Sequence, residues 1–220
     1  FIVRFDRKIR DFQIYDGEKP VGGEQLVGEH ALVRVGFETR RGEQVTARAA
    51  SSFISQMQAV QNLEELGKDD FETVKDKAQA RWDEVLGKIE VTGGTTDQYR
   101  TFYSCLYRST LFPRKFYEID KNGNILHYSP YNGEVLPGYM YTDTGFWDTF
   151  RSLFPLLNFV YPSVNAEIQA GLANAYRESG FLPEWASPGH RGCMVGNNSA
   201  SVISDAILKG VTPEEDIATL

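Results

Sequence analysis

The pattern of apolar residues changes near Gln56, and this change constrains the fold more than any other feature. Before it, "FIVRF", "FQIYD" and "ALVRVGFET" are short, rich in β-forming residues and separated by glycine-containing turns. After it, "QMQAVQNLEEL" and the stretch 69–91 are charged and have a helical pattern. A run of strands followed by a run of helices favours separate β and α units over an alternating fold.

The stretch 69–91 carries one apolar stripe at helical spacing, formed by Phe71, Val74, Ala78, Trp82, Val85 and Ile89. We interpret it as part of a helical linker that covers residues 56–93. Residues 1–55 are then the end of an antiparallel β-domain. Residues 94–220 form a third region, which is mainly helical.

The third region alternates helices with long connections. "TTDQYRTFYSCLYRSTLFP" opens with a capping box, Thr95 and Gln98, and Cys105 falls on its apolar face as a small hydrophobe. A polar, aromatic loop is predicted over 114–144, then a helix from residue 146 and another that ends at Gly180. The loop 181–198 precedes a helix over 199–209, and Pro213 begins a further one. This succession predicts α-hairpins stacked around an axis, with the long loops at one end.

Composition excludes several classes of function. The net charge of -7, without a long basic run, argues against a nucleic-acid partner. No stretch is long and apolar enough for a membrane span, and the two cysteines, far apart, predict no disulfide. Three scattered histidines do not support a zinc site. The chain opens inside a predicted strand without Met, so we expect it to be a piece of a longer protein with its export signal elsewhere.

The two long loops and the start of the helix at 146 concentrate tyrosine, tryptophan, acids, His, Arg and Asn. Aromatic faces can cover the apolar side of a sugar ring, while carboxylates, amides and Arg pair with its hydroxyls. A protein interface favours many of the same residue types. Both interpretations remain open on composition alone.

Two carboxylates stand out in these segments. Asp148, next to Trp147 in "GFWDTFR", is a candidate acid, base or hydroxyl ligand, but an acid at a helix start also interacts well with the helix dipole. Glu184 in "LPEW" is a second candidate, with a solvated turn residue as the alternative.

The remaining candidates carry weaker signals. His190 and Arg191 lie between glycines in "SPGHRGC", which suits backbone close to a ligand, and Cys193 follows without a recognisable catalytic partner. Asn197, with Asn198 after it, is a candidate pocket residue or a helix cap. Asp205 lies within a helix and is expected to be a structural hydrogen-bonding residue.

Three blocks resemble the glycoside hydrolase family 92 α-mannosidases: "FYSCLYRSTLFPRKFYEIDKNG", "GFWDTFRSLFPLLNFVYP" and "GFLPEWASPGHRGCMVGNNSASVISDAILKG". The resemblance extends from "SSFISQMQAVQNLEEL" through residue 212. It implies a multi-domain β + α protein: the tail of an N-terminal antiparallel β-sandwich, a helical linker, and the first part of an (α/α)6 toroid. It also implies a calcium-dependent, inverting exo-α-mannosidase that acts on mannose-containing glycans, often α-1,2-linked, and is exported.

The same resemblance assigns roles residue by residue. Trp147 and Asp148 correspond to the wall and the hydroxyl ligand of a pocket for terminal mannose, and Arg191, Cys193 and Asn197 to its further lining. The general acid, the base and most calcium ligands are expected downstream of residue 220, so no catalytic residue is assigned here. Two alternatives remain: a non-catalytic glycan-binding module, and another toroidal glycosidase of the trehalase-like type.

Overall fold

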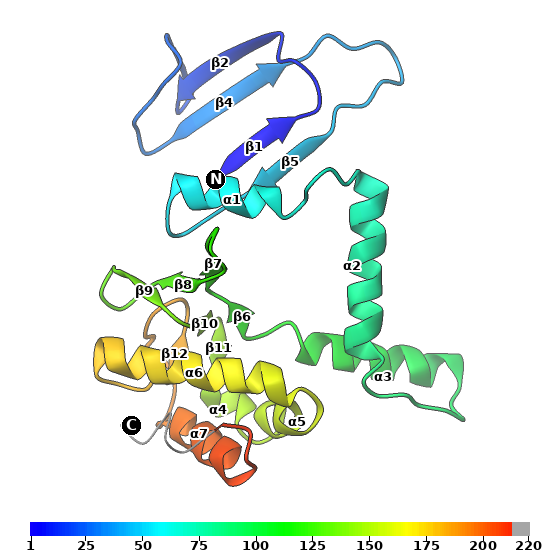
Figure 1. The fold of residues 1–220 in the computed structure, drawn as a ribbon, viewed down its shortest axis with the longest axis vertical. Helices are drawn as coiled ribbons and strands as arrows, with labels where there is room; N and C mark the ends of the chain where they lie inside the picture. The colour runs from blue at the N-terminus through cyan, green and yellow to red at the C-terminus, as the bar shows by residue number, and fades with distance from the viewer. Residues whose placement is uncertain (213–220) are drawn as a thin grey trace.

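The computed structural model describes residues 1–212, so the helix expected from Pro213 lies outside the described residues. Figure 1 shows the strands of the first fifty residues at one end of the molecule and the helices after residue 146 at the other. The mixed β and α character with antiparallel sheets agrees with the prediction. The sandwich, the toroid and the three domain boundaries stay predictions.

The first strands form two small antiparallel sheets. In one, β2 (Asp11–Asp16) is the central strand between β3 (Lys19–Val21) and β4 (Ala31–Gly36). In the other, β1 (Ile2–Phe5) pairs with β5 (Ala47–Ala50). The three predicted strands are confirmed as β1, β2 and β4, whereas β3 and β5 were missed because each is short and has no alternating apolar pattern.

Helix α1 (Gln56–Glu64) connects these strands to the rest of the chain. Ser55 caps it, with its Oγ accepting from the backbone N–H of Gln58 at 3.0 Å. Its side chains also bond to the strand β7 (Glu118–Ile119): the amide of Gln58 donates to the Ile119 carbonyl at 2.8 Å, and that of Asn62 to Glu118 at 2.7 Å. Helix α1 is therefore fixed to a segment about sixty residues further along.

Helix α2 (Phe71–Leu86) packs mainly through its C-terminal end. The predicted stripe is only partly used, because Phe71 is 69% exposed and no residue of the helix is fully buried. Val85, together with Ile89 beyond the helix end, packs against the main core. The carbonyl of Val85 also accepts from the Tyr161 hydroxyl at 3.0 Å.

Helix α3 (Thr96–Ser109) begins with the predicted capping box, which is confirmed in both directions between Thr95 and Gln98. Cys105 is exposed, although it was expected to behave as a small hydrophobe on the apolar face of this helix. It lies beside Phe102 and Leu106 as predicted, but this face of α3 lines an open groove. Neither cysteine is in a disulfide, as predicted.

The segment 114–144, expected to be a loop, contains short antiparallel strands. Strand β6 (Arg114–Lys115) pairs with β10 (Tyr141–Thr142). Between them, β8 (Ile125–Tyr128) is the central strand of a sheet whose outer members are β7 and β9 (Val135–Pro137). Strands β7, β8 and β9 pair through short hairpins, and only β6 and β10 pair over a longer separation. These strands have two to four residues each, which is too short for an alternating apolar pattern to identify them.

The region after residue 144 contains the main core. The helix expected from residue 146 is divided into α4 (Phe146–Thr149) and α5 (Leu153–Val160), followed by α6 (Pro162–Ser179) and α7 (Asn198–Leu208). Gly180 ends α6 with a φ of 80°, which confirms the predicted glycine stop. The buried cluster joins these helices through Phe146, Phe154, Leu157, Ile168, Leu172, Val202 and Ile203.

Candidate functional site

A two-stranded ribbon brings together two segments that sequence analysis singled out. Strand β11 (Thr144–Gly145) leads directly into α4 and pairs antiparallel with β12 (Trp185–Ala186). The backbone N–H of Phe146 donates to the carbonyl of Glu184 at 3.1 Å. The start of α4 and the loop after α6 are therefore neighbours, although about forty residues of chain separate them.

Gly145 allows two side chains, those of Trp185 and Asp148, to lie very close to the backbone of this ribbon. A Cβ atom at this position would lie 2.5 Å from Cε3 of Trp185 and 2.9 Å from Oδ2 of Asp148. Neither gap would hold a methyl group, so glycine is required here for steric reasons. The Trp185 indole and the Asp148 carboxylate therefore both lie against the position that a side chain at residue 145 would occupy, and Trp185 becomes a further aromatic residue of the site.

Trp147 is 39% exposed and has a cation over its ring. The guanidinium carbon of Arg151 lies 4.5 Å from the centroid of Trp147 and 4.4 Å from that of Phe150. Nη1 of Arg151 also donates to the Trp147 carbonyl at 3.2 Å. Arg151, one turn further along the chain, thus holds the Trp147 indole in place and leaves part of the indole surface open to solvent.

The Asp148 side chain is exposed and lines an open groove of about 570 Å³ between α3 and the α4–α5 segment. Within residues 1–212, its carboxylate makes no hydrogen bond or ion pair. It does not cap α4 either, since Gly145 is the N-cap residue and no side-chain cap bond is formed. The carboxylate is therefore available to bind a ligand.

The predicted lining residues are only partly brought together. Arg191 is linked to the ribbon, because its N–H donates to the carbonyl of Trp185 at 2.9 Å and its Nε to that of Ser187 at 2.8 Å. Cys193 is an exposed free thiol further along the loop. Asn197 is at the N-cap of α7, but its side chain makes no cap bond; instead its Oδ1 accepts from the buried Ser199 hydroxyl at 2.6 Å. Among the described residues, no hydrogen bond joins Cys193 or Asn197 to Asp148.

Two other candidates have structural partners. His190 Nε2 lies 2.8 Å from the Ser179 hydroxyl, its ring lies 4.7 Å from that of Tyr131, and burial lowers its pKa. Asp205 accepts from the amide of Asn158 and from Lys209, both at 2.8 Å. The structural interpretation of Asp205 agrees with these contacts.

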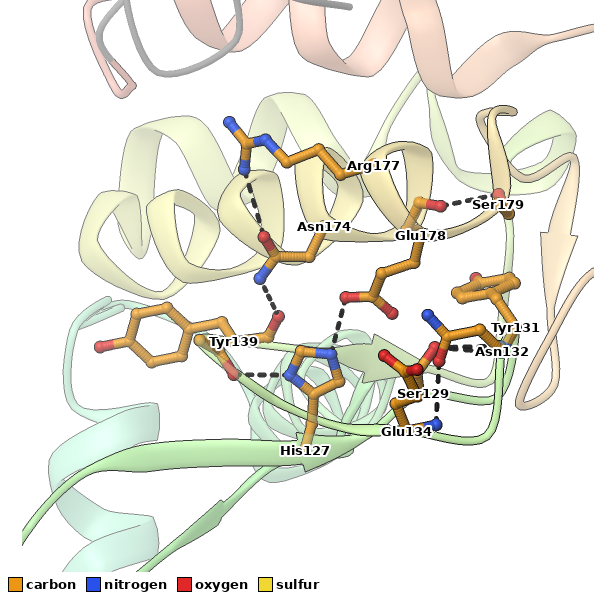
Figure 2. A network of polar contacts seen from close by, with 12 residues as sticks. His127, Ser129, Tyr131, Asn132, Glu134, Tyr139, Asn174, Arg177, Glu178 and Ser179 are labelled. Atoms are coloured by element: carbon orange, nitrogen blue, oxygen red, sulfur yellow. Dashed lines mark hydrogen bonds and ion pairs between the residues drawn. The ribbon is translucent and has the colours of Figure 1, made fainter.

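Sequence analysis missed a buried polar network, drawn in Figure 2. His127, on β8, is completely buried and bridges the Gly138 carbonyl at 2.9 Å to the Glu178 carboxylate of α6 at 2.8 Å. Asn174, one turn earlier on α6, donates to the Tyr139 carbonyl at 2.9 Å. This network ties the small sheet to α6. In the sequence, the network shows only as a histidine within the strand-like stretch "NILHY". That pattern does not identify the partner of the histidine.

Residues 58–219 match the glycosyl hydrolase family 92 catalytic domain. The chain belongs to glycosyl hydrolase family 92. A family 92 inverting mannosidase from Bacteroides thetaiotaomicron VPI-5482 superposes on 99% of this chain with a TM-score of 0.93 and 45% identity. A family 92 α-mannosidase from the same species, solved with mannoimidazole, covers 95% with a TM-score of 0.78 and 27% identity.

A curated relative, described as an uncharacterized secreted glycosidase of Arthroderma benhamiae, is 29% identical over 78% of this chain. The chain spans 30% and 29% of the two matched bacterial structures and 18% of the fungal relative. No helix formed by residues 1–212 has both the length and the apolar character that crossing a membrane requires.

The resemblance to the family 92 α-mannosidases implies a calcium ion. Calcium takes six to eight oxygen ligands, several of them carboxylates. Within residues 1–212, no group of three or more His, Cys, Asp or Glu side chains could hold a metal ion. The described residues therefore offer no cluster of carboxylates for calcium, and no chemical step here is assigned to the ion.

Proposed function

We propose that the full-length protein is an exo-α-mannosidase that releases terminal α-linked mannose from mannose-rich glycans with inversion of configuration. The family assignment supports this over a trehalase-like glycosidase. The names of the matched bacterial structures, an inverting mannosidase and an α-mannosidase, support the choice of mannose. The residues of this chain contribute part of the substrate pocket.

The observation that carries the proposal is the Trp147–Asp148 pair. Asp148, whose carboxylate has no protein partner among the described residues, directly follows Trp147, whose indole is fixed in place by Arg151. A pyranose presents an apolar C–H face, which suits the indole, and hydroxyl donors, which suit the carboxylate. Trp185, which lies against Gly145 as Asp148 does, extends the aromatic wall.

Within this proposal the chain's own residues bind and orient the sugar. Asp148 accepts hydrogen bonds from mannose hydroxyls, and Arg191 and Asn197 supply donors further along the loop. An inverting mechanism needs two carboxyl groups roughly 6.5–9.5 Å apart, one to protonate the leaving oxygen and one to activate water. We place both outside these 220 residues, as the resemblance implies, so neither Asp148 nor Glu184 is assigned to proton transfer.

Linkage, calcium and location are finer parts of the same proposal. We expect α-1,2-linked mannose to be preferred and calcium ligands to come mainly from outside this chain. We also expect export, because the fungal relative is described as secreted. Each of these is tested separately from the main activity.

The test uses the full-length protein with α-1,2-, α-1,3- and α-1,6-linked mannobiose, followed by NMR of the anomeric protons. We expect β-mannose to be released before mutarotation, and fastest from the α-1,2 isomer. The activity should be lost on adding a calcium chelator and regained with excess calcium. Early release of α-mannose would contradict inversion. Binding without turnover would replace the proposal by a glycan-binding module, and turnover that the chelator leaves unchanged would remove the calcium part alone.

A further inference from the structure

Asp143 has an unusual backbone conformation at the entrance to the site. Within residues 1–212, it is the one non-glycine residue with a positive φ, 60°. It connects β10 to β11, two residues before Gly145. Left-handed backbone at a non-glycine residue persists where surrounding contacts hold it, and Asp tolerates this conformation better than most residues.

The Asp143 carboxylate is shared between two segments. Its Oδ2 accepts from the guanidinium of Arg114, with Nε at 2.6 Å and Nη2 as a second donor. Its Oδ1 accepts from the Ser187 hydroxyl at 2.9 Å. The side chain of Asp143 is 19% exposed, whereas Arg114 is 64% exposed, so the carboxylate is the more enclosed partner.

These partners lie next to the strands that flank Asp143. Arg114 is on β6 opposite Thr142, and Ser187 follows β12, whose Ala186 is opposite Thr144. Asp143 therefore stands where the chain leaves one ribbon and enters the other. Its two oxygens hold both ribbons in one arrangement.

The contacts continue to a proposed substrate ligand. The Ser187 carbonyl accepts from Nε of Arg191 at 2.8 Å, and the Ser187 N–H donates to the Gly189 carbonyl at 2.9 Å. The Thr142 hydroxyl donates to the Pro188 carbonyl at 3.4 Å, a second link between the same segments. A shift of Ser187 would thus displace Arg191. A change at Asp143 would also alter the backbone path through β11 that leads to Trp147 and Asp148.

We propose that Asp143 is a positioning residue, whose carboxylate holds the Trp147–Asp148 segment and the Arg191 loop in the geometry that binds substrate. This rests on the proposed mannosidase function. Asp143 itself need not touch the sugar. Its effect comes from pre-organising two segments, and small misplacements of ligands are costly to catalysis.

The first test is Asp143→Asn in the full-length protein. Asn also tolerates a positive φ and has nearly the same size. It keeps only one acceptor oxygen, so it can accept from Arg114 or from Ser187 but not from both. We expect kcat/KM on the mannobiose to fall by about tenfold or more, with a raised KM and an unchanged shape of the pH profile. Ser187→Ala removes only the Oδ1 bond and should give a smaller loss in the same direction.

The matched control is Asp120→Asn. Asp120 also accepts several bonds in a turn, including the N–H groups of Asn122 and Asn124 at 2.8 Å, but it lies in the hairpin between β7 and β8. Its substitution should leave kcat/KM within about twofold of wild type. If Asp143→Asn and Ser187→Ala lower only the melting temperature and leave kcat and KM at the control's level, the proposal is overturned.

A readout that does not need activity separates this proposal from the proposed function. Hydrogen exchange of the Ser187 and Arg191 amides, both bonded within the loop, should quicken in Asp143→Asn and Ser187→Ala but not in Asp120→Asn. If the wild-type protein lacks mannosidase activity, the function fails while exchange still decides the positioning role. Unchanged exchange at both amides would overturn that role even in an active enzyme.

Discussion

The strands before residue 51 and the helices after residue 145 are stabilised in different ways. In residues 1–57, all of which the structure describes, no side chain is buried, and Leu32 and Val33 on β4 are 56% and 58% exposed. By contrast, Phe146 and Phe154 are at most 1% exposed and stack with centroids 5.7 Å apart. Within the described residues, the strands are joined by backbone ladders without buried side chains, whereas the helices pack through buried apolar side chains.

This difference teaches where the site can be precise. A ligand-binding geometry needs side chains that packing holds in place, and of these two regions the helical one supplies them. Trp147 and Asp148 follow directly after Phe146, which is a core residue. The core therefore holds the backbone of Trp147 and Asp148 in place.

The largest expected effect is on stability, from Phe154→Ala. Phe154 is completely buried, so the substitution should lower the free energy of unfolding by about 3–5 kcal/mol through lost burial and a residual cavity. Denaturant unfolding of the full-length protein measures it. A loss below about 1 kcal/mol would show that the helices after residue 145 are not stabilised mainly by apolar burial.

The next effect separates two carboxylates of the helical part. Asp148→Ala should reduce kcat/KM on the order of a hundredfold, since two charge-assisted bonds to sugar hydroxyls are worth roughly 1.5–3 kcal/mol each. The pH dependence of the residual activity should keep its shape, because Asp148 is not assigned to proton transfer. The measurement is kcat/KM across pH, with the melting temperature alongside.

Asp205→Ala is the matched control for Asp148→Ala. It removes the acceptor of Asn158 and Lys209, so it should cost about 1–3 kcal/mol of stability and leave kcat/KM within about threefold of wild type. The reverse outcome would be a stable but inactive Asp205 variant together with an active Asp148 variant of lowered melting temperature. It would indicate that Asp148 only stabilises the start of its helix.

A smaller effect concerns pH and burial at Tyr131. Burial raises the pKa of this phenol to about 12, and the Glu178 carboxylate adds to the rise. Because the folded pKa exceeds the unfolded value of about 10, the contribution to stability is complete below pH ~10 and is lost as pH rises through ~12. Between pH ~8 and ~11, the unfolding free energy should fall by about 1.4 kcal/mol from this group.

Tyr131→Phe isolates that contribution, since it keeps the ring and removes the titrating hydroxyl. Denaturant unfolding of wild type and variant at both pH values gives the difference in slope. Parallel pH dependences would show that the Tyr131 hydroxyl is as accessible to solvent as an open strand side chain.

The smallest effect is expected from Leu32→Ala, the counterpart of Phe154→Ala on the β side. With more than half of the side chain exposed, the unfolding free energy should change by less than about 0.5 kcal/mol. Comparison of the 220-residue chain with the full-length protein sharpens the result. A loss of about 2 kcal/mol or more in the full-length protein alone would show that other parts of it cover β4.

Local signals predicted the parts of the fold that depend on nearby residues. The capping box at Thr95, the glycine stop at Gly180 and three of the five N-terminal strands are confirmed, because each depends on residues within a few positions. The strands of 114–144 were missed because each has at most four residues. The His127–Glu178 contact was missed for another reason, because it joins residues fifty-one positions apart. Non-local pairing leaves no short-range pattern.

For the site, the sequence by itself determined which side chains are available: the Trp147–Asp148 pair, the Arg191 loop and the resemblance that assigned the family. Only the tertiary structure decided that Trp185 and Asp148 both lie close to Gly145, and that Asp143 joins Arg114 to Ser187. The physical reason is one of range. Side-chain chemistry is fixed residue by residue, whereas close approach between distant segments depends on how strands pair and how helices bury their apolar faces.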